Sequence, residues 1–106
     1  MSLYEIYITY VSWGNGGKDR PVLVFELDNG VASVYSVTSQ YTGTGIHEKY
    51  YKINDWAEAG LHKQSYVDTS SYFDIPLRFL SNKTSIGRLS FDDKKALLKF
   101  LSHEVE

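Results

Sequence analysis

In this chain of 106 residues, an arginine lies at the start of the first strand of a predicted β-hairpin and a threonine at the end of its second strand. Arg20 lies where a glycine-bearing segment meets the apolar run PVLVFEL, and the DNG triplet at residues 28–30 is a strong hairpin turn signal. Arg20 lies eight residues before Asp28 and Thr38 lies eight after Gly30, so the two are expected to meet at the open end of the hairpin. A guanidinium presents a rigid fork of donors that matches phosphate oxygens, and a hydroxyl can donate to the same group. The pair is therefore a candidate phosphate site.

The segment before Arg20 is expected to form a flexible loop. Gly16 and Gly17 would let the backbone take several shapes and approach a phosphate, and Lys18 adds a positive charge. Because Pro21 fixes the start of the next strand, the arginine would be rigid on one side and accessible on the other. We therefore predict a lid of Gly16, Gly17 and Lys18 over the phosphate site. A second polar loop is predicted from Thr38 to Gly45.

Alternation of apolar residues and turn signals predict five to seven short antiparallel strands. These strands are expected over residues 4–11, 21–27, 31–37, 47–54, 63–73 and 83–90. A C-terminal helix is expected over residues 91–104, with Ser90 as its N-cap and Asp92 and Asp93 in its first turn. The sequence therefore predicts one α+β domain over residues 1–106, mainly β, built on a curved sheet or half-open barrel.

Burial is also predictable from the pattern. The first strand alternates as if one of its faces were buried, and Tyr51 and Ile53 are expected to point inward. Pro76 argues against a regular strand at its position, where a short helical turn is expected instead. The apolar surface of the terminal helix is expected to comprise Phe91, Leu97, Leu98, Phe100, Leu101 and Val105.

Composition narrows the function classes. The chain has no cysteine, which excludes disulfide frameworks and thiolate zinc sites, and no apolar run is long enough for a membrane span. We expect a cytoplasmic protein. Its net charge of −2 lacks the basic excess of a typical nucleic-acid binder, so a nucleic-acid site would have to rest on a local patch. The histidines His47, His62 and His103 have no metal-ligand spacing and are expected at the surface. The tyrosines are expected mainly as sheet residues rather than as a base-stacking platform.

Four segments, taken in order, resemble the MazF/PemK family of toxin ribonucleases. They are GGKDRPVLVFE, VYSVTSQ, AGLHKQSYVDTSSYFDI and IGRLSFDDKKALLKFL, which together cover most of the chain. Two positions depart from the family pattern: LYEIY replaces the usual start of the first strand, and Ser36 stands where the family has a proline before its threonine motif.

The resemblance implies an SH3-like antiparallel barrel with a C-terminal helix, and a homodimer. It also implies a metal-independent endoribonuclease without a cofactor that cuts single-stranded mRNA and is held in check by a small antitoxin protein. By motif, the catalytic arginine falls on Arg20 and the catalytic threonine on Thr38, with Ser39 and Asp19 as assisting residues. Gln40 would contact RNA together with the predicted lid.

Two matters stay open at the level of sequence. The general base is unassigned, with Asp19 and Glu26 as candidates by proximity, and Arg20 has the structural alternative of an ion pair with either carboxylate. The competing functions are a non-catalytic protein of the same fold, which would be either a gyrase-poison-like relative or a toxin fold that has lost catalysis, and an SH3-like module that binds a peptide.

Overall fold

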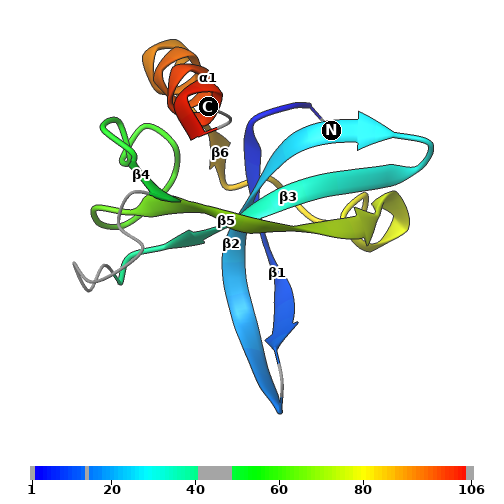
Figure 1. The fold of residues 1–106 in the computed structure, drawn as a ribbon. Helices are drawn as coiled ribbons and strands as arrows, with labels where there is room; N and C mark the ends of the chain where they lie inside the picture. The colour runs from blue at the N-terminus through cyan, green and yellow to red at the C-terminus, as the bar shows by residue number, and fades with distance from the viewer. Residues whose placement is uncertain (1, 14, 41–48, 105–106) are drawn as a thin grey trace.

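A single antiparallel sheet and one helix make up the computed structural model, which describes residues 2–13, 15–40 and 49–104 (Figure 1). The strands are β1 (Glu5–Trp13), β2 (Gly16–Asp28), β3 (Val31–Thr38), β4 (Tyr50–Lys52), β5 (Tyr66–Pro76) and β6 (Gly87–Arg88). A 3₁₀ turn, η2 (Leu77–Phe79), follows β5, and the helix α1 (Phe91–Glu104) ends the described chain. The strand order is β4-β5-β3-β2-β1-β6. Among the described residues, no helix is long and apolar enough to cross a membrane.

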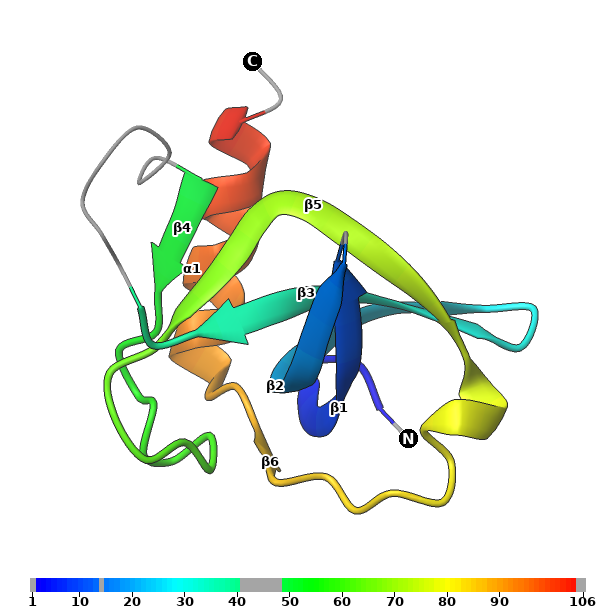
Figure 2. The ribbon, with the colours of Figure 1, turned by 90° about the horizontal axis from the view of Figure 1, so that it is seen from below.

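The sheet is strongly curled, and β5 arches across β3 in Figure 2. Every strand pair is antiparallel. The curl produces a half-barrel with α1 packed on one side, which confirms the predicted α+β class, the barrel-like sheet and the terminal helix.

Two separate apolar clusters lie on the two faces of the sheet, and β2 belongs to both. Leu23 packs in the cluster beneath α1, together with Leu97 of the helix, whereas Val22 and Val24 pack in the other cluster. All three β2 side chains are fully buried. Since side chains alternate across a strand, a run of consecutive apolar residues is what a strand buried on both faces requires.

The first strand differs from its prediction. Its buried side chains come from both faces, because Ile6 packs in the cluster beneath α1 while Tyr7 and Val11 pack in the opposite one. Ile8 and Tyr10, which share a face with Ile6, are 39% and 61% exposed. The prediction of a single buried face was wrong because the curled sheet offers β1 a different neighbour at each end.

The prediction that the lid segment forms a loop was also wrong. Gly16, Gly17 and Lys18 belong to β2 and pair with Trp13, Ser12 and Val11 of β1. The reason for glycine here is steric, since a Cβ at Gly17 would lie 2.5 Å from the hydroxyl of Tyr10. The aromatic ring covers the glycine, an arrangement that stabilises glycine within a strand.

Each of the two prolines lies where its own strand pairs with another strand on one side only. Pro21 lies inside β2 and not at its start, but β2 pairs there with β1 alone, since its ladder with β3 begins at Val22. Pro76 closes β5 opposite Val31, three residues beyond the predicted end of that strand. A proline lacks the N–H donor, so both positions fit a strand with a free side. The helical turn expected after Pro76 is confirmed as η2.

The start of α1 is tied to the sheet through one buried carboxylate. Ser90 Oγ accepts a hydrogen bond from the backbone N–H of Asp93 at 3.1 Å, which confirms the predicted N-cap. Asp93 is 1% exposed. Its carboxylate accepts from the Tyr51 hydroxyl at 2.6 Å and from the backbone N–H groups of Asn54 and Asp55 at 3.0 and 2.7 Å. One side chain therefore joins the helix, β4 and the turn that follows β4.

The helix buries a narrower stripe than predicted. Leu97 is fully buried, and Phe100 and Leu101 pack against the same cluster. Leu98 and Phe91 are instead 47% and 73% exposed. Val105 lies outside the described residues.

Replacing Asp93 with alanine is expected to destabilise the fold by about 3 kcal/mol, because several buried donors lose a charged acceptor. Asp92→Ala is the matched control, since Asp92 lies in the same first turn but is exposed, and its loss is expected to cost less than about 1 kcal/mol. Urea unfolding at neutral pH measures both. Equal losses would contradict the proposed tie between the helix and the sheet.

The hydroxyl of Tyr51 should make stability fall at alkaline pH. Burial and the Asp93 carboxylate both raise the pKa of this hydroxyl. The folded pKa lies above the unfolded value, so the stabilisation is complete below about pH 10 and is lost as the pH rises further. Tyr51→Phe is expected to cost about 1–2 kcal/mol at pH 7 and to flatten the alkaline decline. Urea unfolding at several pH values between about 8 and 11 tests this, and parallel declines in the two proteins would refute it.

Candidate functional site

The candidate site opens where β2 parts from β3. The ladder between these strands ends at the pair Val22–Ser36. The part of β2 that precedes Val22 in the chain pairs with β1 alone. A register shift between Val24 and Glu26 places the last pairs one residue away from the register that the hairpin turn would set. Extending the ladder past Val22–Ser36 aligns Arg20 with Thr38, and both residues line the opening. The predicted alignment therefore depends on the register shift, because the turn alone would place Ser39 opposite Arg20.

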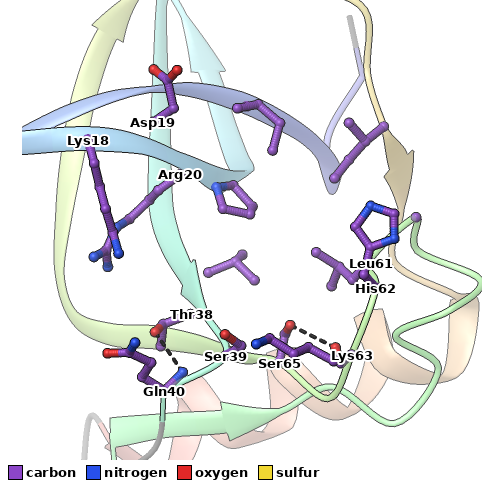
Figure 3. Close-up of a pocket in the computed structure, with 15 residues that line it drawn as sticks. Lys18, Asp19, Arg20, Thr38, Ser39, Gln40, Leu61, His62, Lys63 and Ser65 are labelled. Atoms are coloured by element: carbon purple, nitrogen blue, oxygen red, sulfur yellow. Dashed lines mark hydrogen bonds between the residues drawn. The ribbon is translucent and has the colours of Figure 1, made fainter.

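A cavity of about 330 Å³ occupies this opening (Figure 3). It is lined by Ile8, Lys18, Asp19, Arg20, Pro21, Val37, Thr38, Ser39, Gln40, Gly60, Leu61, His62, Lys63, Ser65 and Ile86. Its lining is largely apolar and includes three residues with a formal positive charge, Lys18, Arg20 and Lys63. Asp19 is the one acidic residue among the described residues that line it. The acidic chain therefore holds a locally basic cavity, which is the kind of patch that the composition required.

Arg20 is held by its position in the sheet. It pairs with Thr9 of β1, is partly buried and extends its side chain beside that of Lys18, toward the side of the cavity that carries Thr38 and Gln40 (Figure 3). Burial and the Asp68 carboxylate raise the pKa of the Tyr50 hydroxyl, and the nearby Arg20 cation opposes this shift. The guanidinium thus lies within electrostatic reach of β4. An arginine fixed by a strand pair reaches a phosphate with less loss of side-chain freedom than one on a loop.

Thr38 ends β3 at the lower rim of the view in Figure 3. Its Oγ1 accepts a hydrogen bond from the backbone N–H of Gln40 at 3.1 Å. A hydroxyl that accepts one bond can still donate its own proton, so Thr38 is oriented and still able to donate to an anion in the cavity. Ser39 and Gln40 are exposed and line the same rim.

Strand alternation separates the charges of β2. Lys18 and Arg20 point to the cavity side, whereas Asp19 points away from them (Figure 3). Asp19 still lines the cavity, but its carboxylate is poorly placed to act between the two cations. Glu26, the other candidate base, is excluded by the fold, because it pairs with Ser33 near the closed end of the hairpin and does not line the cavity.

Sequence reasoning missed the opposite wall. Leu61, His62 and Lys63 face Arg20 and Lys18 across the cavity in Figure 3, and the side chain of Lys63 runs toward Ser39. This wall is positioned by Gly60, which has a φ of +89° and no room for a Cβ against the backbone of Ile86. The segment AGLHKQS carried the family resemblance, but nothing in its pattern shows that it folds back over β2.

The remaining site predictions divide clearly. The structure brings together Lys18, Arg20, Thr38, Ser39 and Gln40 around one cavity, whereas Gly16 and Gly17 do not line it. His62 is exposed at the surface, as predicted, although it lies on the rim of the cavity.

Several other residues singled out from the sequence cannot be placed relative to this cavity. His47 and most of the predicted second loop lie outside the described residues, and the side chain of His103 is not among those described. Within the described part of the chain, no group of three or more His, Cys, Asp or Glu side chains is placed to hold a metal ion.

Comparisons with known proteins place the fold. No protein-family profile and no curated protein sequence matches the chain. Among solved structures, the chain is similar to the Mycobacterium tuberculosis toxin MazF-mt6, with 21% identity, 93% of each chain covered and a TM-score of 0.70. At this identity the likeness concerns the fold, and it confirms the barrel that the sequence motifs implied. The chain therefore has a MazF-like fold.

Proposed function

We propose that this protein is the toxin of a toxin–antitoxin pair and that it cleaves single-stranded RNA. The observation that carries the proposal is the meeting of Arg20 and Thr38, from two strands that part at this point, in one basic cavity. The MazF-like fold supports the toxin class. A homodimer, an antitoxin that covers the cavity and a cytoplasmic location belong to the same proposal.

The proposed reaction uses the 2′-hydroxyl of the substrate as its nucleophile. The 2′-oxygen attacks the adjacent phosphorus, the bond from phosphorus to the 5′-oxygen breaks, and the products are a 2′,3′-cyclic phosphate and a 5′-hydroxyl. The proton of the 2′-hydroxyl leaves to a base, and the 5′-oxygen takes a proton from an acid or from water. No described residue is assigned as the base.

The residues of the cavity would act on the charge of the phosphate. The guanidinium of Arg20 stabilises the phosphorane, whose negative charge exceeds that of the starting diester, and the Thr38 hydroxyl donates to a second oxygen. Lys18 and Lys63 lie on opposite walls, where they would hold the flanking phosphates of the strand. The apolar residues of the lining would receive a sugar or base edge between them.

Purified protein is expected to cut single-stranded RNA in the presence of EDTA and to leave a 2′,3′-cyclic phosphate. Arg20→Ala should lower the cleavage rate by about 10²–10³-fold or more, because a preorganised donor to the transition state is lost. Arg88→Ala is the matched control, since Arg88 is exposed on β6 and does not line the cavity. Circular dichroism checks that both variants fold, and an Arg20→Ala variant that cuts at the normal rate would reject the site.

Lys18 and Lys63 should contribute to RNA affinity through phosphate contacts. Each change to glutamine is expected to weaken binding of a 2′-deoxy-substituted, uncleavable oligonucleotide and to reduce the salt slope by about 0.7, the value for one phosphate on a single strand. Fluorescence anisotropy over a range of salt concentrations measures both quantities. Lys99→Gln, on the exposed surface of α1, serves as the control and should leave the slope unchanged.

The non-catalytic alternatives make different predictions. Growth arrest on expression without RNA cleavage at high protein concentration would favour a gyrase-poisoning toxin. The absence of both effects would favour a peptide-binding module.

A further inference from the structure

A second hollow lies at the β1–β2 ribbon and is distinct from the basic cavity. We call it the rear pocket; its volume is about 470 Å³, and it is lined by Thr9, Tyr10, Asp19, Asp74, Ile75, Pro76, Phe79 and Lys83. These residues come from β1, β2, β5, η2 and the segment after η2. Among the residues that the structure describes, Asp19 alone lines both this pocket and the basic cavity, because β2 passes between them.

Two aromatic side chains at the rear pocket are exposed to solvent. Tyr10 is 61% exposed and Phe79 is 52% exposed. Tyr10 lies across Gly17, which has no side chain to displace the ring. The guanidinium of Arg78 already lies 4.9 Å from the ring centroid of Phe79. Arg78 therefore already occupies one face of this ring, as expected from the negative potential over an aromatic face. An incoming guanidinium would stack on the other face, on the Tyr10 ring, or in exchange with Arg78.

The charges of the rear pocket are opposite in sign to those of the basic cavity. Asp19 and Asp74 supply two carboxylates, and Lys83 supplies one ammonium group. One oxygen of Asp74 accepts a hydrogen bond from the Ser33 hydroxyl at 2.7 Å, which orients the carboxylate. The hydrogen bond leaves the other oxygen of Asp74 for an external donor.

We propose that the rear pocket binds an arginine side chain presented by a partner protein. The planar guanidinium stacks on aromatic faces and donates in a fork to a carboxylate, so it matches both features of the pocket at once. The net negative charge disfavours a nucleic acid here. A partner could therefore bind the rear pocket while the basic cavity is occupied, and this inference does not depend on RNA cleavage.

The probe is a capped glycine–serine pentapeptide with one central arginine, titrated into the ¹⁵N-labelled full chain. Saturable shifts of backbone amides around Tyr10, Asp74 and Phe79 are expected, with a Kd of about 1 mM. The same peptide with citrulline, which keeps the shape but lacks the charge, should not bind. A lysine peptide should bind several-fold more weakly, because it cannot stack or donate in a fork.

Two variants test the pocket itself. Phe79→Ala and Asp74→Asn are each expected to weaken the arginine peptide by about tenfold. Phe91→Ala and Asp92→Asn are matched controls on the exposed surface of α1 and should leave its affinity unchanged. Arg20→Ala should also bind the peptide normally, which separates this site from the proposed catalytic one.

Several outcomes would overturn the proposal. They are the absence of saturation up to about 50 mM peptide, equal binding of the citrulline peptide, shifts that map elsewhere, or normal binding by Asp74→Asn. Light scattering adds one more: self-association that Phe79→Ala abolishes would mean that a second copy of the chain covers the pocket, in place of an arginine-bearing partner.

Discussion

The arrangement of the molecule depends on one constraint, which is that β2 pairs with two different strands along its length. Its first half pairs only with β1, and its second half pairs with β3, with a short overlap around Val22 and Leu23. Where β2 leaves β3, the sheet opens and a cavity forms. The same transition lets Pro21 sit inside the strand and holds Arg20 in a regular ladder at the edge of that cavity.

The opposite side of the cavity depends on a second, more local interaction. The buried Asp93 carboxylate ties α1 to Tyr51 and to the backbone of the turn after β4. That turn leads to Gly60, whose contact with Ile86 brings His62 and Lys63 over the cavity. A helix that appears remote from the cavity therefore supports the wall that carries Lys63.

Strand alternation gives the β1–β2 ribbon two chemically different sides. Lys18 and Arg20 face the basic cavity, while Asp19 points away, toward the side where Tyr10 is exposed. A chain with a net charge of −2 can in this way combine a basic surface and an acidic, aromatic one within a few residues. Whole-chain charge averages over both and describes neither, because local fields depend on which side chains share a face.

The sequence by itself determined the strand–turn–strand unit around DNG and the start of α1 at Ser90, since each follows from neighbours in the chain. The hairpin count predicted that Arg20 and Thr38 meet, but the register shift between Val24 and Glu26 sets that alignment. The barrel was predicted from the motifs that resemble the family. The sequence could not show that Gly16–Lys18 form a strand, because that depends on the Tyr10 ring covering Gly17. Nor could it show that β1 buries both faces, that Lys63 joins the cavity or that Phe79 meets Asp19 at the rear pocket. Those features join residues distant in sequence, and only the curl of the sheet brings them together.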